Sequence, residues 1–364
     1  MAFLPDKPYN ALPLLPPPPE QWETLAVYRI LAEARAAIAE LKGRMPVIPN
    51  PLMLINTLVL QEAKDSSSIE NIFTTSDKLY KAFASTNTQT DPQTKEVLRY
   101  RTALYEAWQQ LQHQDFAIEL LENIYRTIKD TKDGVRDVEV FIGNRFQVVY
   151  TPPCCRDLLL EKLNNLLAFI RENDQIDPLV KMAILHYQFE AIHPFTDGNG
   201  RAGRVLNVLY LTQAGVLEQP VLYLSQYINA FKADYYRLLQ QVTMHGHWEA
   251  WIMYMLTAVK ETAIETLRKV NAIHDLLKYT VEMVRTNAPD VYSRELIDML
   301  FVQPYCKISF LVDAGIASRN TASKYLNRLV ELGLLEKEQM GSESLYLNKK
   351  LYELLSNESK LHKI

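Results

Sequence analysis

Residues 193–204 combine the side chains that a polyphosphate site needs, in the order His-Pro-Phe-Thr-Asp-Gly-Asn-Gly-Arg-Ala-Gly-Arg. The glycines at 198 and 200 let the backbone turn, so that consecutive N–H groups can point into one cavity and hold an anion. A helix that begins near Gly200 adds its free N–H groups and positive dipole end, with Arg201 and Arg204 three apart on its first turn. The stretch therefore predicts a site that holds two phosphates separately.

Two more side chains in this stretch suit chemistry on phosphates. Asp197 is a hard oxygen ligand of the kind that Mg²⁺ prefers, and His193 has an ordinary pKa near neutrality, as a general base requires. Each piece alone has a structural explanation, because Gly-Asn-Gly is most often a turn and paired arginines usually face solvent. Their order and spacing together favour the functional interpretation.

The stretch fills every fixed position of the motif His-Pro-Phe-x-[Asp/Glu]-Gly-Asn-Gly-Arg-x-x-Arg, and in this the chain resembles the Fic-domain proteins. The resemblance implies a helical core that transfers AMP from ATP to a Tyr, Thr or Ser hydroxyl of a protein and releases pyrophosphate. It also implies that His193 deprotonates the hydroxyl and that Asp197 holds Mg²⁺. The nucleotide-binding residues that it implies in this loop are Gly198, Asn199, Gly200, Arg201, Ala202, Gly203 and Arg204. Phosphoryl-type transfer needs mainly positioning, charge neutralisation and a nearby base, and this loop supplies them.

A second pattern lies upstream, in residues 65–75. Ile69, Ile72 and Phe73 fall at i, i+3 and i+4, which predicts a helix that buries all three and leaves Ser66 and Glu70 on a different face. Taken alone, a Ser and a Glu at this spacing are most often a solvated pair or part of a helix cap.

The Fic resemblance gives these residues a further meaning. Ser66, Glu70 and Asn71 match the motif [Ser/Thr]-x-x-x-Glu-[Gly/Asn] of an inhibitory helix, which precedes the core in the N-terminally inhibited class. The resemblance implies that Glu70 pairs with Arg204, so that ATP binds without its α-phosphate aligned for attack. Charge-assisted Arg–carboxylate pairs are strong and geometrically selective. We therefore expect a protein that is held mostly inactive.

Two weaker patterns belong to the same resemblance. Residues 141–153 read as a β-hairpin, with a Gly-Asn turn, a run of β-formers and a Pro-Pro stop. Taken alone this is an ordinary surface hairpin, whereas Fic proteins place here a flap that holds the target by strand addition. The residues concerned are Gln147, Val148, Val149 and Tyr150.

Downstream, Tyr235 and Tyr236 resemble a family segment whose aromatic rings lie near the adenosine. Adjacent tyrosines on a helix face different directions, so we expect one of them to pack in the core.

Bulk properties fit a regulated enzyme. The 364 residues suffice for two or three domains, and 48% hydrophobic residues can fill sizeable cores. A net charge of −4 gives no general basic surface for nucleic acid or membranes. Three cysteines without metal-ligand spacing, no apparent signal peptide and no long apolar run predict a cytoplasmic protein without membrane association.

The expected fold class is mainly α. We expect an N-terminal helical region with the inhibitory helix at 1–94, a Fic catalytic core with a small β-hairpin flap at 95–265, a linking helix at 266–290, and a winged helix-turn-helix domain at 291–364. The proline-rich arm at 13–19 is expected to be an extended tether. A polar linker is expected at 84–94.

The C-terminal pattern permits more than one function. Arg319, Asn320, Thr321, Lys324 and Arg328 lie on or near the expected recognition helix. However, residues 306–347 contain five Lys or Arg against five Asp or Glu, which gives no net attraction for DNA phosphates. DNA binding, docking of a partner and homodimer formation therefore stay open.

Two alternatives to the transferase remain. The chain could be a nucleotide-sensing, DNA-binding transcriptional regulator, or a hydrolase in which Glu70 orients a water that removes AMP from a modified protein. The target protein, which could be the chain itself, is not encoded in these patterns.

Overall fold

Helices dominate this computed structural model, which describes residues 3–48, 50–84, 90–143, 146–172, 175–341 and 343–356; the strands form two small sheets. The first part of the chain forms α1 (Leu25–Arg44), α2 (Pro51–Ile69), α3 (Ser76–Ala84), α4 (Pro92–Gln110) and α5 (Ile118–Lys129). Then follow β1 (Ile142–Gly143), β2 (Val148–Tyr150), α6 (Arg156–Arg171), α7 (Pro178–Ile192), α8 (Asn199–Gln213), α9 (Leu224–Ala230), α10 (Lys232–His245) and α11 (Trp248–Asn287). The mainly α prediction is confirmed.

Helices α7 and α8 form the centre of the molecule. Nearly every residue of α7 is buried, as expected for a helix that is apolar on all sides. Helix α8 packs against it and is buried over most of its length. The predicted phosphate loop is the connection between these two helices, so the site rests on the most enclosed part of the fold.

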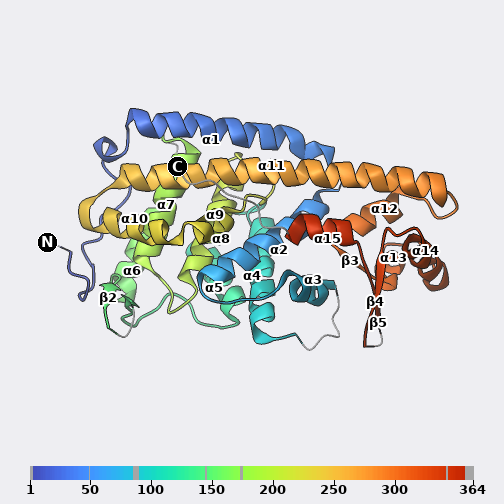
Figure 1. Cartoon of the computed structure of the whole chain (residues 1–364). Coiled ribbons are helices and arrows are strands. Elements are labelled where there is room, and N and C mark those ends of the chain that lie inside the picture. The colour runs from blue at the N-terminus through green and yellow to red at the C-terminus, as the bar shows by residue number, and fades with distance from the viewer. Residues whose placement is uncertain are drawn as a thin grey trace.

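A single long helix joins the two ends of the molecule. Helix α11 runs for 40 residues and packs along α1, whose Val27, Ala34 and Leu41 form a fully buried seam at seven-residue spacing (Figure 1). The boundary expected at 265 between core and linking helix therefore lies inside a continuous helix. The expected break at 286–290 coincides with the end of α11 at Asn287.

The N-terminal arm is not a free tether. Leu12, Leu15 and Trp22 are buried, and the backbone of Leu15 exchanges two hydrogen bonds with the side chain of Asn165, at 2.8 and 3.2 Å. Burial of these apolar side chains holds the arm on the core, whereas a proline-rich segment alone is surrounded by solvent. The expectation of a simple tether is wrong for this arm.

The C-terminal part consists of α12 (Arg294–Phe301), β3 (Tyr305–Cys306), α13 (Ile308–Asp313), α14 (Arg319–Glu331), β4 (Glu336–Met340), β5 (Glu343–Leu347) and α15 (Lys349–Ser356). The strands pair antiparallel in the order β3-β5-β4, and Gly341 lies in the connection between β4 and β5. This order is consistent with the predicted winged helix-turn-helix. We call residues 291–356 the C-terminal module.

The C-terminal module packs on the helices that precede the core. Tyr305 donates its hydroxyl to the Asp77 carboxylate at 2.7 Å, and Lys81 pairs with Glu338 at 2.9 Å. Helix α15 contacts α2 and α11. In Figure 1 the module lies at the opposite end of the molecule from the β1–β2 hairpin. Among the described residues, no helix has the length and apolar character that crossing a membrane requires.

Residues 85–89 of the polar linker expected at 84–94 lie outside the described residues. Its end is clear, because Asp91 accepts a hydrogen bond from the Thr94 N–H at 2.8 Å and so caps the start of α4.

Candidate active site

The loop between α7 and α8 is held in a strained but well-supported conformation. Helix α7 ends as His193 adopts a left-handed backbone, with φ 49°, and its N–H donates to the Phe189 carbonyl at 3.0 Å. Gly198, with φ 73°, starts α8. The Asn199 side chain closes the loop by bonding both the N–H and the carbonyl of Phe195 at 2.8 Å. Its amide therefore shapes the loop, and a contact of Asn199 with phosphate stays a prediction.

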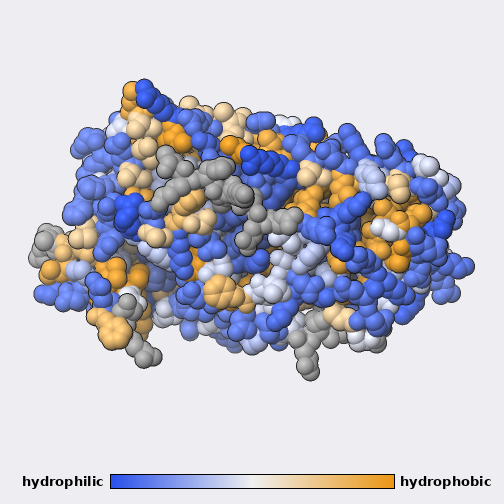
Figure 2. All heavy atoms as spheres, in the orientation of Figure 1, coloured by the Kyte–Doolittle hydropathy of each residue, from blue (hydrophilic) through white to orange (hydrophobic). Residues whose placement is uncertain are grey.

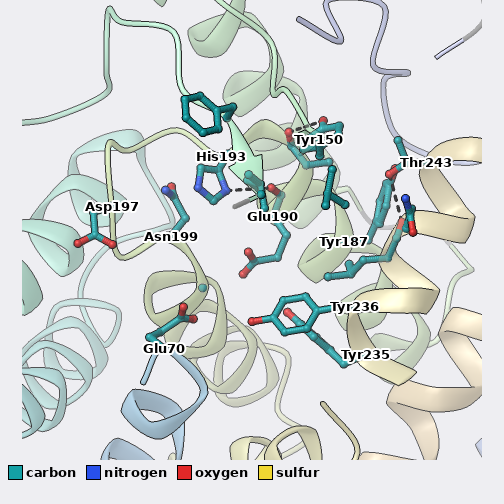
Figure 3. A pocket seen from close by; sticks show the side chains of 18 of the residues that line it. Glu70, Tyr150, Tyr187, Glu190, His193, Asp197, Asn199, Tyr235, Tyr236 and Thr243 are labelled. Atoms are coloured by element: carbon teal, nitrogen blue, oxygen red, sulfur yellow. Dashed lines mark hydrogen bonds between the residues drawn. The ribbon is translucent and has the colours of Figure 1, made fainter. Parts of the chain in front are cut away.

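The hydrogen bonds of His193 define which ring nitrogen carries the proton. Nδ1 lies 3.3 Å from the Glu190 carbonyl oxygen. A carbonyl only accepts, so Nδ1 carries the hydrogen and Nε2 keeps its lone pair. Burial lowers the pKa of His193 to about 4, although the hydrogen bond with Glu190 opposes the shift. The ring is thus neutral near pH 7, and in Figure 3 its other edge faces the loop that carries Asp197 and Asn199.

Asp197 presents its carboxylate at the edge of the cavity, where the side chain is 67% exposed. Its Oδ1 accepts from the Gly198 N–H at 2.6 Å, and its Oδ2 lies 2.6 Å from the Lys129 ammonium. Partial burial raises the pKa of Asp197, but the contacts with Lys129 and Gly198 outweigh this and lower it. The group is an anion at neutral pH.

This arrangement suits Mg²⁺ only together with phosphates. Within the described segments, no three His, Cys, Asp or Glu side chains gather as a metal site. Mg²⁺ commonly binds through one or two carboxylates plus substrate phosphates and water, and an ionised, exposed Asp197 beside the loop fits that mode.

Arg204 is bound by the end of α2. The guanidinium is 1% exposed, and its Nε donates to Ser66 Oγ at 2.8 Å. Its Nη2 donates to the Ser66 carbonyl at 2.8 Å and to Glu70 Oε1 at 2.9 Å. A Cβ on Gly200 would overlap this Glu70 carboxylate, so glycine is needed for the approach. The structure therefore brings Ser66 and Glu70 of the upstream motif to Arg204 of the loop motif, which lies 138 and 134 positions further along the chain.

The end of α2 explains the last position of the upstream motif. The helix stops at Ile69, Asn71 adopts φ 61°, and the Ile72 N–H donates back to the Ser67 carbonyl at 3.0 Å. Asn tolerates this left-handed conformation, so Asn71 turns the chain and leaves Glu70 at the helix end. The predicted helix through Phe73 is wrong, because the chain reverses before it and Phe73 is 66% exposed.

Arg201 occupies a different position from Arg204. It is 1% exposed and its Nη1 lies 2.6 Å from Glu96 Oε1 on α4. Arg204 lines the cavity, whereas residues 201–203 are outside its lining as the structure describes it, so their contact with a nucleotide stays a prediction. Gly203 allows α7 and α8 to pack closely, because a Cβ there would lie 2.6 Å from Glu190 Oε1.

These elements enclose a cavity of about 640 Å³. Its polar end is formed by Glu70, His193, Asp197, Gly198, Asn199, Gly200 and Arg204. The end away from Asp197 is mainly aromatic, with Tyr150, Tyr187 and Tyr236 (Figure 3). Phe3, Leu239, Gln240 and Thr243 also line the cavity. The cavity can therefore hold a ligand with a polyanionic end and a flat apolar end.

The hairpin and the paired tyrosines border this cavity. Strands β1 and β2 pair antiparallel, and Val149 and Tyr150 line the cavity, whereas Gln147 and Val148 lie outside its lining as the structure describes it. Tyr235 is 2% exposed and bonds His186 at 2.8 Å, while Tyr236 is 45% exposed. One tyrosine packs in the core, as predicted, yet both contribute to the wall.

Four charged residues at the site escaped the sequence patterns: Glu96, Lys129, Arg136 and Glu190. Arg136 donates to the carbonyls of His193, Val138 and Pro153 at 2.7–2.8 Å, and so ties both ends of the flap segment to the catalytic loop. Burial raises the pKa of Glu190 to about 8, although the charge of Arg204 opposes the shift. Helical spacing from His193 could have indicated Glu190; the other three lie in segments that carry no local signal.

Comparison with protein families agrees with this geometry. Residues 28–109 match the Fic/DOC family N-terminal model, residues 113–211 match the Fic/DOC family model, and residues 276–351 match the C-terminal domain of SoFic-like protein adenylyltransferases. The phosphate loop and the upstream motif both lie within the first two matches, and so does the polar end of the cavity.

Individual relatives cover shorter segments. A probable protein adenylyltransferase of Aquifex aeolicus is 30% identical over 138 residues, which are 38% of this chain and 42% of that protein. The protein adenylyltransferase fic-1 of Caenorhabditis elegans is 30% identical over 111 residues, 29% of this chain and 21% of that protein. The chain thus matches less than half the length of these two curated relatives.

A solved Fic family protein from Desulfovibrio desulfuricans shares the fold over most of both chains. The TM-score is 0.56 at 22% identity, over 89% of this chain and 96% of that one. With two Fic/DOC matches that together contain both motifs, this chain belongs to the Fic/DOC family.

Proposed function

We propose that this protein is a protein adenylyltransferase, which transfers AMP from ATP to a Tyr, Thr or Ser hydroxyl of a target protein. One observation carries the proposal: a neutral histidine, an exposed carboxylate and a glycine-rich helix start line one cavity. Membership of the Fic/DOC family and relatives named protein adenylyltransferases support it.

The proposed reaction follows from the groups in the cavity. His193 Nε2 accepts the proton of the target hydroxyl, whose oxygen forms a bond to the α-phosphorus of ATP. The bond from that phosphorus to the bridging oxygen of the β-phosphate breaks, and pyrophosphate leaves with the bonding electrons. A base with a pKa near 4 is unprotonated at pH 7, so it can accept this proton.

The phosphates would lie at the polar end of the cavity. The N-terminus of α8 offers free N–H groups around Gly198 and Gly200, and Arg204 is the cation in the lining beside them. Asp197 would hold Mg²⁺, which supplies charge neutralisation on the phosphate oxygens. The base of the nucleotide would lie at the aromatic end, with Tyr236 near it.

The contact of Glu70 with Arg204 supports autoinhibition. Glu70 accepts from Nη2 and Ser66 accepts from Nε and Nη2, so this edge of the guanidinium already has partners that an outer phosphate would have to replace. Because Glu70 is 33% exposed while Arg204 is buried, the carboxylate is the partner that can move away. We propose that its departure frees Arg204 and permits alignment of the α-phosphate.

The target segment would dock at the hairpin. The flap end of the molecule exposes apolar side chains, including Val138 at 56%, Phe141 at 66% and Phe146 at 96%, and hydrophobic atoms gather there in Figure 2. An extended target segment can add to the edge of β2 while apolar side chains of the target pack on this rim.

The test compares wild type, Glu70→Gly and His193→Ala, each incubated with Mg²⁺ and ATP labelled at either the α or the γ phosphorus. We expect label from the α position only, increased in Glu70→Gly and lost in His193→Ala, on the protein itself or on proteins of a cell lysate. His113→Ala is the matched control, because His113 is exposed and lies outside the lining of the cavity. Label from the γ position, or undiminished label in folded His193→Ala, would refute the proposal.

The same reaction mixtures separate the hydrolase alternative. If labelled protein releases AMP in wild type and this release is lost in Glu70→Gly, the glutamate orients a water and the enzyme works in reverse. Binding of DNA or of a second copy through the C-terminal module, and a cytoplasmic location, remain predictions from sequence.

A further inference from the structure

Four charged side chains form an alternating chain beside the phosphate loop. Asp197 lies 2.6 Å from Lys129, Lys129 lies 3.3 Å from Glu96, and Glu96 lies 2.6 Å from Arg201. Asp197 and Arg201 belong to the loop and the first turn of α8, whereas Lys129 ends α5 and Glu96 lies on α4. Two helices thus bring one cation and one anion to the loop from outside its motif.

Lys129 is held over the loop by its position and its stem. It is the last residue of α5, which Asp130 ends with φ 54°. A Cβ built on Gly198 would lie 3.2 Å from Cγ and Cδ of Lys129, so the stem crosses the loop at its glycine. The ammonium therefore lies beside the exposed carboxylate of Asp197, while the stem of Lys129 lies against the loop.

The ammonium occupies the oxygen that a divalent cation would need. Oδ1 of Asp197 already accepts from the Gly198 N–H, and Oδ2 is the atom next to Lys129. Two cations on one carboxylate oxygen repel each other, and an ammonium bound there reduces the charge that attracts a metal. Binding of Mg²⁺ at Oδ2 of Asp197 therefore competes with Lys129.

Glu96 offers Lys129 a second partner. Its Oε1 already accepts from both Lys129 and Arg201. Partial burial raises the pKa of Glu96, but these two cations outweigh burial and lower it. When Lys129 leaves Asp197, its ammonium can therefore stay paired with the Glu96 carboxylate.

We propose that Lys129 is a built-in counterion of Asp197 that a divalent cation must displace toward Glu96, so that this lysine sets how much divalent metal the site requires. This inference rests on the proposed function only in assigning Asp197 to the metal. Lys129 is a positioning residue, because it acts through Asp197.

The test measures metal binding and does not depend on AMP transfer. Full-length protein is titrated with Mn²⁺ in the presence of α,β-methylene-ATP, and the electron paramagnetic resonance signal of free Mn²⁺ gives the dissociation constant. For Lys129→Met we expect about three- to five-fold tighter Mn²⁺ binding, the size expected for removal of one partly exposed ion pair. Lys129→Arg, which keeps the charge, should bind Mn²⁺ as wild type does.

Two controls make the result specific. Lys132→Met removes an exposed lysine three positions further along and should leave the dissociation constant unchanged. Asp197→Asn should lose most of the Mn²⁺ binding, which shows that the signal comes from this site. Thermal unfolding of each variant shows that it is folded.

The outcomes are distinct. Unchanged Mn²⁺ binding in folded Lys129→Met overturns the proposal, and weaker binding overturns it as well, because Lys129 would then support the phosphates. Wild-type Mn²⁺ binding in Asp197→Asn overturns the assignment of the metal and with it the proposal. A failure of the proposed AMP transfer would appear in the labelling experiment alone and leave the Mn²⁺ titration interpretable.

Discussion

Charged side chains are arranged in opposite ways at the phosphate loop and in the C-terminal module. At the loop, Arg201 and Arg204 are each 1% exposed and pair with carboxylates that lie 105 and 134 positions earlier in the chain. In the C-terminal module, Arg294 pairs with Asp298 and Arg328 with Glu331, four and three residues apart on one helix, and of these four side chains only Asp298 is less than 40% exposed.

This difference separates two uses of charge. An exposed pair within one helix contributes roughly 0.3–0.5 kcal/mol and is screened by salt. A buried arginine strongly destabilises the protein when its partner is lost, so its partner must be replaced, for example by phosphate. At the loop a ligand can therefore replace a carboxylate as the partner of a buried arginine, whereas the pairs within the helices of the module offer no such exchange.

The largest expected effect is on catalysis at the loop. Replacing His193 by Ala removes the only base that the proposed reaction uses, and general bases contribute roughly 10²–10⁴-fold to rate. We expect AMP transfer by Glu70→Gly/His193→Ala to fall by about that factor relative to Glu70→Gly, measured as the rate of label incorporation. A loss of less than ten-fold in a folded protein would show that the loop does not supply the base.

The next largest effect is expected from a substitution that breaks the contact between Glu70 and Arg204 and leaves both charged residues in place. Gly200→Ala places a methyl group where the Glu70 carboxylate lies, so the contact with Arg204 should be lost. We expect a loss of about 1–2 kcal/mol in the free energy of unfolding, measured with urea. In a Glu70→Gly background the same substitution should cost clearly less; an equal cost in both backgrounds would mean that Glu70 is not what the methyl group displaces.

A smaller effect concerns pH. Because burial raises the pKa of Glu190 from 4.5 to about 8, the folded protein keeps a proton that the unfolded chain releases. Stability from this group is therefore lost as pH rises from about 4.5 to 8. Between pH 5 and 8, the midpoint of thermal unfolding should fall more for wild type than for Glu190→Gln. Parallel midpoints for the two proteins would contradict this, and Glu331→Gln in the module, where the carboxylate is exposed, serves as the control.

The smallest effect is expected in the module. Glu331→Gln removes the partner of Arg328, and we expect a change below about 0.5 kcal/mol in the free energy of unfolding. AMP transfer should stay within two-fold of wild type, because the pair lies at the end of the molecule away from the flap. A larger loss in urea unfolding would mean that the module also depends on its surface charges.

The sequence alone determined features that depend on neighbours along the chain. The glycine-rich turn, the helix after it, the hairpin and, in the module, the three helices and the β4–β5 wing follow from local propensity and spacing, whereas β3 and α15 were not predicted. The partner of Arg204 was also predictable, but only through resemblance of the motif that contains Glu70 to a known inhibitory helix. One tyrosine in the core and one at the surface follow from the geometry of adjacent helical residues.

Only the tertiary structure decided which distant side chains meet at the loop. Lys129 and Glu96 reach Asp197 and Arg201 because α5 and α4 pack beside α8, and no spacing within either helix records that. Packing likewise placed the N-terminal arm against the core. Local patterns determine turns and helix faces because their interactions span a few residues, whereas contacts between segments that lie far apart in the chain arise only when helices pack together.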